Sequence, residues 1–236
     1  MNLINKNEIH LIESTHTYVL ESNPDIKFDS ATEVIGEYFS KFDSDVIAKK
    51  LVSTHEKYIG MSEKELKDQW AAATKMGTDI HKEIEQHLIN GKIPTINKSE
   101  LGIQWIKKYK MKGDLEIFPE VIIYSEELGI AGTVDIITKD KLTGKYEIID
   151  WKTGKYERES YRGKMCSNDI TADLMDCKFE KYSLQISLYR YLLEKYYGLD
   201  IQNQIIAHIF DDRCEGFVVP YYKGHIEKII NSTRKD

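Results

Sequence analysis

The sequence predicts an α/β fold in which a mixed β-sheet is flanked by helices and preceded by a helical N-terminal lobe. Two observations lead to this fold class. Helical periodicity with capping signals dominates the first part of the chain, whereas short β-branched and aromatic runs begin at Glu120. A strongly helical segment at 182–197 then separates the central runs from two further strand-like runs. Helices and strands therefore alternate in the second half of the chain.

The N-terminal lobe is expected to contain a hairpin and several helices. Residues 8–20 read as a β-hairpin, and helices are expected to start near residues 31, 45 and 63. The first and third of these starts carry Ser-x-x-Glu, the spacing of a capping box, in which the two side chains satisfy each other's backbone N–H groups. The third helix is expected to run to Leu88, with an interruption at Gly77, and to stop at Asn90-Gly91. Another helix is expected at 99–111.

The predicted sheet has about five strands. Its centre is a meander of three short runs, at 120–124, 130–138 and 146–151. Two later runs, at 204–210 and 216–221, complete the sheet, and a short helix closes the chain.

The bulk properties indicate one continuous domain. A length of 236 residues suits a single core, which we divide into a hairpin and helical lobe at 1–98 and a sheet-bearing core at 99–236. A net charge of −6 gives no overall attraction to nucleic acid. The absence of a long apolar run or a leader-like N-terminus predicts a cytoplasmic protein. Three widely spaced cysteines predict neither a disulfide framework nor a metal cluster.

Candidate catalytic residues lie on two neighbouring strands of the meander. Asp150 and Lys152 are two apart in a strand and therefore face the same side, and a hairpin partner can place Asp135 beside them. Two carboxylates in one place are suitable ligands for Mg²⁺ or Mn²⁺. Together with such a metal ion, a lysine can assist the hydrolysis of a phosphodiester. The alternative is an ion pair on an exposed strand. The neighbouring Ile148-Ile149 argues against it, because charges on a buried strand need a reason.

The order and spacing of these residues resemble a known nuclease family. Gly132-Thr-Val-Asp135 followed by Ile149-Asp150-Trp151-Lys152-Thr-Gly154 is similar to the PD-(D/E)XK core in its RecB-like exonuclease form. Gly77-Thr78-x-x-His81 resembles the histidine motif of that branch, and Gln185-x-x-x-Tyr189 its helix after the core. Glu120 matches the acidic residue before the core. The resemblance covers roughly residues 70–200, and a looser one to phage exonucleases and the mitochondrial genome maintenance exonuclease extends to the N-terminus.

The resemblance implies a restriction-endonuclease-like fold and a role for each matched residue. It implies that Mg²⁺ or Mn²⁺ is held by His81, Asp135, Asp150 and the backbone carbonyl of Trp151, and that Lys152 is the catalytic cation. Glu120 belongs to the implied catalytic residues. If the strand paired in a shifted register, Glu126 or Glu127 would take its place. Gln185 and Tyr189 would approach the site or the DNA backbone. Taken alone, His81 and the Gln185–Tyr189 pair could equally be ordinary helix residues.

Two groups of basic residues could contact DNA. One follows the catalytic strand and has tyrosines between its charges: Lys155, Arg158, Arg162 and Lys164, with Tyr156 and Tyr161. We interpret this group as functional, since lysine and arginine bind phosphates and tyrosine stacks on bases. The other group crowds the end of a helix: Lys107, Lys108, Lys110 and Lys112. We interpret the second group as a solvated face.

The sequence thus predicts a metal-dependent DNA exonuclease that favours single strands or free ends. A structure-selective endonuclease on the same fold and a catalytically silent DNA-binding module are the alternatives. The resemblance further suggests a bacterial or phage setting, in which recombination or replication proteins are possible partners.

Overall fold

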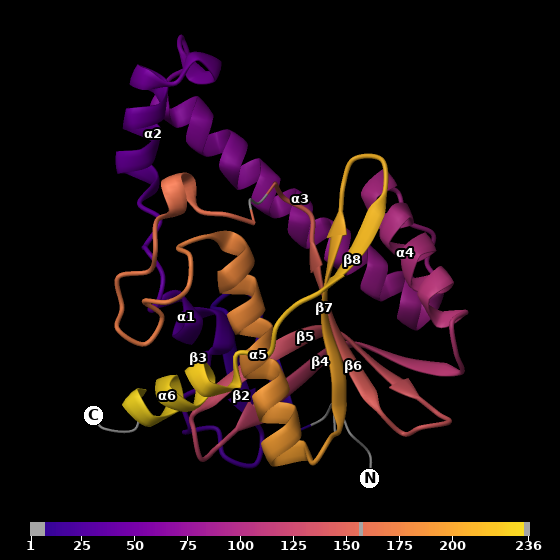
Figure 1. Ribbon diagram of the computed structural model, residues 1–236. Coiled ribbons are helices and arrows are strands. Elements are labelled where there is room, and N and C mark those ends of the chain that lie inside the picture. The colour runs from indigo at the N-terminus through magenta and orange to yellow at the C-terminus, as the bar shows by residue number, and fades with distance from the viewer. Residues whose placement is uncertain (1–7, 156–157, 234–236) are drawn as a thin grey trace.

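The sheet at the centre of the molecule carries helices on both faces (Figure 1). The computed structural model describes residues 8–155 and 158–233. This arrangement confirms the predicted fold class, a mixed sheet flanked by helices and consistent with a restriction-endonuclease-like fold.

Six strands form the main sheet. They are β3 (Asp29–Ser30), β4 (Leu115–Ser125), β5 (Ile130–Asp140), β6 (Tyr146–Lys152), β7 (Ile201–Ile209) and β8 (Cys214–Val218). The β3–β5 and β6–β7 pairs are parallel, and the β4–β5, β5–β6 and β7–β8 pairs are antiparallel. The prediction of about five strands is wrong by one, because the two-residue β3 is too short to leave a strand pattern in the sequence.

Strand β5 has β4 along one edge, and β3 and β6 share its other edge. Pairing with β4 runs the length of β5, from Ile130 to Asp140. Pairing with β3 involves Ile130 and Ala131, and pairing with β6 begins at Ile136. Between Ala131 and Ile136, β5 therefore has no strand from the described part of the chain paired along this edge, which leaves an open edge in the middle of the sheet.

The N-terminal lobe consists of a small hairpin and a helical arm. Its elements are β1 (Ile9–Ile12), β2 (Thr17–Leu20), α1 (Ala31–Gly36), α2 (Ser44–Thr54), η1 (Glu56–Tyr58) and α3 (Glu63–Asn90). Both predicted capping boxes are present, at the starts of α1 and α3. Helix α3 ends at Gly91, whose φ of 70° is readily adopted without a Cβ.

Helix α3 passes through Gly77 without a break, so the predicted interruption is wrong. A single glycine inside a helix costs about 1 kcal/mol. Packing of Ile80 and Ile84 against the sheet supplies more than that.

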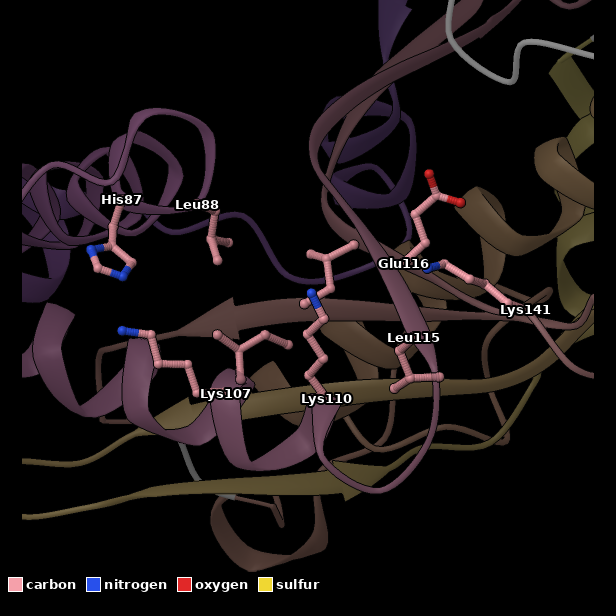
Figure 2. A pocket seen from close by; sticks show the side chains of 9 residues that line it. His87, Leu88, Lys107, Lys110, Leu115, Glu116 and Lys141 are labelled. Atoms are coloured by element: carbon pink, nitrogen blue, oxygen red, sulfur yellow. The ribbon is translucent and has the colours of Figure 1, made fainter.

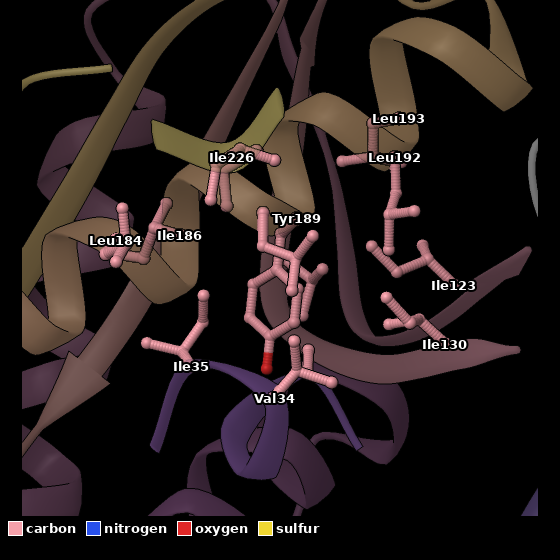
Figure 3. Packing of buried hydrophobic residues seen from close by; sticks show 14 of the residues in the cluster. Val34, Ile35, Ile123, Ile130, Leu184, Ile186, Tyr189, Leu192, Leu193 and Ile226 are labelled. Atoms are coloured by element: carbon pink, nitrogen blue, oxygen red, sulfur yellow. The ribbon is translucent and has the colours of Figure 1, made fainter. Parts of the chain in front are cut away.

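The two faces of the sheet pack against different helices. Helices α3 and α4 (Asn97–Lys110) cover one face, where Ile84, Ile106 and Trp151 share a core cluster. Helices α5 (Lys178–Tyr197) and α6 (Lys223–Thr233) cover the other face, together with α1. Tyr189 reaches from α5 toward Val34 and Ile35 in this second cluster (Figure 3). None of the helices in the described ranges combines the length and apolar character that crossing a bilayer requires.

Candidate active site

Asp135 lies where the edge of β5 is open. Continuing the β5–β6 register one residue beyond Ile136↔Ile149 sets Asp135 opposite Asp150, and the regular pairing stops just before that position. Oδ2 of Asp135 instead accepts the backbone N–H of Trp151 at 2.7 Å. The carboxylate therefore replaces a backbone acceptor of the sheet, which fixes its position beside the end of β6.

Glu120 faces Asp135 from the neighbouring strand. The β4–β5 register passes from Pro119↔Ile136 to Val121↔Val134, which leaves Glu120 opposite Asp135. The backbone of Glu120 is left-handed, with φ of 49°. Such a conformation costs a non-glycine residue about 1–3 kcal/mol and recurs at functional sites. The local strain at Glu120 thus coincides with the open edge of β5.

His81 completes a group of three ligand-type side chains. Its Nδ1 lies 3.5 Å from Oδ2 of Asp135. One ligand atom each from His81, Glu120 and Asp135 lie within 4.8 Å of one another. Two carboxylates and one imidazole are a chemically suitable donor set for Mn²⁺ or Mg²⁺. We call these three residues the carboxylate–histidine cluster.

Gly77 lets α3 approach the end of β6 closely enough to present His81. A Cβ at Gly77 would lie 3.0 Å from Oγ1 of Thr153, one residue after Lys152. Gly77 and His81 are i and i+4, so they share one face of the helix. The Gly-Thr-x-x-His pattern therefore has a packing reason at its first residue and a ligand-type side chain at its last.

Asp150 and Lys152 form a buried ion pair next to the carboxylate–histidine cluster. Nζ of Lys152 lies 2.5 Å from Oδ2 of Asp150, and Asp150 is 3% exposed. The same ammonium lies 4.4 Å from the ring centroid of Tyr182 on α5, a cation–π distance. The sequence reasoning missed Tyr182, although its position three residues before Gln185 on the same helix was a usable signal.

The electrostatics of the site favour charged forms of His81 and Lys152. Burial lowers the pKa of His81, but the carboxylate of Asp135 outweighs it, so the pKa of His81 is raised. Burial likewise acts to lower the pKa of Lys152. The carboxylates of Asp150 and Asp135 outweigh burial, so the pKa of Lys152 is also raised. Lys152 is therefore a protonated cation held inside the protein.

Two predicted metal ligands, Asp150 and the Trp151 carbonyl, are not among the side chains of the carboxylate–histidine cluster. The carboxylate of Asp150 lies against Lys152, and the side chain of Trp151 packs on the opposite face of the sheet with Trp105, their ring centroids 5.6 Å apart. Ligation by Asp150 and by the Trp151 carbonyl stays a prediction.

Gln185 and Tyr189 lie beneath the site rather than on its surface. Nε2 of Gln185 donates to the Tyr189 hydroxyl at 2.9 Å, and the two residues are 8% and 3% exposed. Burial, with Asp150 nearby, raises the pKa of Tyr189. The structure brings this pair to the floor of the site next to Asp150, and a direct contact with DNA stays a prediction.

The basic segment after β6 is held by contacts within the protein. The guanidinium of Arg158 lies 4.1 Å from the ring centroid of Phe217, and Nζ of Lys164 lies 2.6 Å from Oδ2 of Asp176. Arg162 lies on an exposed turn with φ of 56°. Of the two interleaved tyrosines, Tyr161 is 76% exposed, and Tyr156 is outside the described residues.

The strand end that carries Lys152 is fastened by residues that sequence reasoning did not single out. Lys98, in the first turn of α4, donates to the carbonyl of Thr153 at 3.2 Å. Nε2 of His208 lies 3.0 Å from the carbonyl of Gly154. Burial lowers the pKa of His208, which favours the neutral imidazole. These contacts join residues 54 and 55 positions apart, so no local pattern indicated them.

Comparisons with known proteins give weak likenesses. No family model and no curated protein matches the chain. The solved structure of SSO0001 is similar at 16% identity and a TM-score of 0.40, over 94% of this chain and 80% of that one. A protein from Eubacterium rectale named "Putative exonuclease" is similar at 13% identity and a TM-score of 0.38, over 92% of this chain and 80% of that one. Values this low do not establish a shared function.

Proposed function

We propose that this chain is a divalent-metal-dependent nuclease that hydrolyses phosphodiester bonds in DNA. The observation that carries the proposal is the carboxylate–histidine cluster, whose ligand atoms lie within 4.8 Å of one another beside the buried Asp150–Lys152 pair. A cation and a metal-type donor set in one place can stabilise the charge that develops on a scissile phosphate and activate the attacking water.

Each residue of the site has a defined task in this proposal. A bound Mg²⁺ or Mn²⁺ supplies Lewis-acid polarisation and lowers the pKa of bound water. His81, Glu120 and Asp135 hold the ion, and Asp150 either joins them or keeps the Lys152 ammonium in place. Lys152 presents its positive charge to the scissile phosphate, where negative charge grows in the transition state.

The finer form of the proposal is an exonuclease that prefers single-stranded DNA or free ends. It is supported by the similarity of the Gly132–Asp135 and Ile149–Gly154 segments to RecB-like exonucleases. Contacts to DNA are assigned to Arg158, Arg162 and Lys164, whereas the buried Gln185 and Tyr189 approach the active site from below. A setting with recombination or replication proteins in a bacterial or phage-infected cell belongs to the same proposal.

A cleavage assay tests both levels of the proposal. Linear end-labelled single-stranded DNA, linear duplex and closed circular single-stranded DNA are incubated with Mg²⁺, Mn²⁺ or EDTA. We expect metal-dependent loss of the linear substrates and survival of the circle, because an exonuclease needs an end. Cleavage of the circle would show that the activity is endonucleolytic and that the exonuclease assignment is wrong. Stable binding to DNA without metal-dependent cleavage would leave only a binding module.

The matched control for this assay is Asp135→Asn, which removes one carboxylate charge without changing side-chain volume. Its activity should vanish while its unfolding midpoint stays close to that of the wild type. Equal cleavage by the Asp135→Asn variant would point to a contaminating nuclease rather than to this site.

A further inference from the structure

A cavity lies between the C-terminal parts of α3 and α4 and the start of β4 (Figure 2). Its volume is about 410 Å³, which is within the size range of small-ligand pockets. Its apolar lining consists of Leu88, Ile106, Leu115 and Ile117, and its polar lining of His87, Lys107, Lys110, Glu116 and Lys141. We call it the lysine cavity.

The charged groups of the lysine cavity are mostly cationic and come from separate elements. Lys107 and Lys110 are i and i+3 on α4 and so share one face, and Lys141 comes from the turn after β5. Figure 2 shows the two α4 lysines extending toward α3, where His87 faces them. Lys141 also has an ion pair with Asp114 at 3.3 Å. Glu116 is the acidic residue in the lining.

The α4 helix dipole alone does not account for this arrangement. Lysines in the last turn of a helix are favoured by its carbonyl end, and that explains why Lys107, Lys108 and Lys110 occur there. It does not explain why two of them meet a lysine from a β-turn around one partly apolar cavity. In a chain of net charge −6, the lining of this cavity thus holds three lysines against one glutamate.

The lysine cavity lies along the same elements as the candidate active site. His87 follows His81 by six residues on α3, a rise of about 9 Å. Ile117 precedes Glu120 by three residues on β4, about 10 Å along the strand.

We propose that the lysine cavity binds a nucleotide unit, with its phosphate between Lys107 and Lys110 and its base or sugar against the apolar lining. A nucleotide of a bound single strand, outside the scissile bond, has this chemistry, and so does a free mononucleotide. The strand form of this inference rests on the proposed nuclease function, whereas the free-nucleotide form does not.

Binding measurements in EDTA test the lysine cavity without any cleavage. A fluorescently labelled 12-nucleotide single strand is titrated at several salt concentrations, and deoxyadenosine monophosphate is titrated by calorimetry. The test variant is Lys107→Gln/Lys110→Gln. The matched control is Lys223→Gln/Lys228→Gln, an equal charge change at exposed positions of α6. Both variants should keep the wild-type unfolding midpoint, because all four side chains are exposed.

If the cavity holds a phosphate of the strand, the test variant should lower the log–log salt slope of single-strand binding by about 0.7, the value for one phosphate contact. If the source is a free nucleotide, the wild type should bind the monophosphate and the test variant should lose that binding at least tenfold. Wild-type behaviour of the test variant toward both ligands would overturn the inference. If the test variant loses binding and the wild type cuts no DNA, the inference about the lysine cavity would stand and the proposed nuclease function would be wrong.

Discussion

The two aspartates of the candidate active site have pKa values shifted in opposite directions. Burial raises the pKa of Asp150, and the nearby charge of Asp135 adds to that rise. Burial also acts to raise the pKa of Asp135. The charges of His81 and Lys152 and the hydrogen bond from the Trp151 N–H outweigh burial, so the pKa of Asp135 is lowered. Asp135 is therefore the more readily ionised of the two and the better anchor for a cation.

The carboxylate–histidine cluster leads to a prediction for metal binding. His81→Ala, Glu120→Ala and Asp135→Ala should each weaken Mn²⁺ binding at least tenfold, since even residues that only orient a metal ligand contribute about 10–100-fold. Calorimetric titration of Mn²⁺ into each variant measures the effect. Glu126→Ala is the control, because a shifted register would transfer the role of Glu120 to Glu126. Wild-type affinity in all three cluster variants would remove the metal site from the account.

The packing of α5 on β5 depends on the absence of a side chain at Gly132. A Cβ there would lie 2.6 Å from Cε1 of Tyr189 and 3.1 Å from Cβ of Ala31. Both neighbours are buried and cannot simply swing away. The close approach holds Tyr189, and through it Gln185, under the open edge of β5.

We therefore predict that Gly132→Ala lowers the free energy of unfolding by about 1–3 kcal/mol, the range for overpacking a core. The cost should shrink in a Tyr189→Leu background, where the clashing ring is gone, and a double-mutant cycle in urea measures the coupling. Gly154→Ala is the control, since a Cβ there meets nothing within 4 Å. Equal costs in both backgrounds would show that Tyr189 does not set the requirement for glycine.

Helix α4 is capped by a side chain from α3 rather than by its own N-cap. Ile96 precedes the helix and has no capping side chain. The carboxylate of Glu83 accepts the N–H groups of Thr95 and Ile96, each at 3.0 Å. Burial raises the pKa of Glu83, but these hydrogen bonds and that from the Thr95 hydroxyl lower it to about 2.

A carboxyl with a lowered pKa stabilises the fold above its unfolded pKa of 4.5, and this contribution is lost as the pH falls toward about 2. Glu83→Gln should therefore cost about 1 kcal/mol at neutral pH, a typical loss for a helix cap. The difference from the wild type should narrow between pH 5 and pH 3. Urea unfolding at several pH values measures it, with Glu85→Gln on the same helix as the control. A difference that does not change with pH would contradict the capping role.

Short-range patterns in the sequence predicted the elements better than their junctions. The capping boxes at Ser30 and Ser62 located two helix starts, and Gly91 located a helix end. The shared edge of β5 could not be predicted, because it depends on a two-residue strand pairing across about 100 residues. The left-handed backbone of Glu120 could not be predicted either, because left-handed conformations favour glycine and nothing in the local sequence marks this glutamate. The contacts of Lys164 with Asp176 and Ser40, and the lysine cavity, likewise depend on side chains from distant elements.

The overall charge of the molecule makes any attraction to DNA local. With a net charge of −6, binding should depend on a few exposed cations. Arg162→Gln should lower the log–log salt slope of single-strand binding by about 0.7, the value for one phosphate contact. Lys41→Gln, at another exposed position, should leave the slope unchanged. The same slope in the Arg162 variant and the wild type would mean that the turn at 161–163 is solvated surface.

Single-turnover cleavage by Lys152→Ala tests the whole account most directly, because the proposal gives Lys152 a role in the transition state but not as a metal ligand. The account predicts that the variant binds Mn²⁺ and DNA as the wild type does and cuts about 10²–10⁴ times more slowly. Lys152→Arg, which keeps the charge opposite Asp150, should fold as the wild type but restore little activity, since a planar guanidinium cannot replace a compact ammonium. Near-wild-type cleavage by a folded Lys152→Ala would contradict the account, and the Asp150–Lys152 pair would then be only a buried ion pair in the sheet.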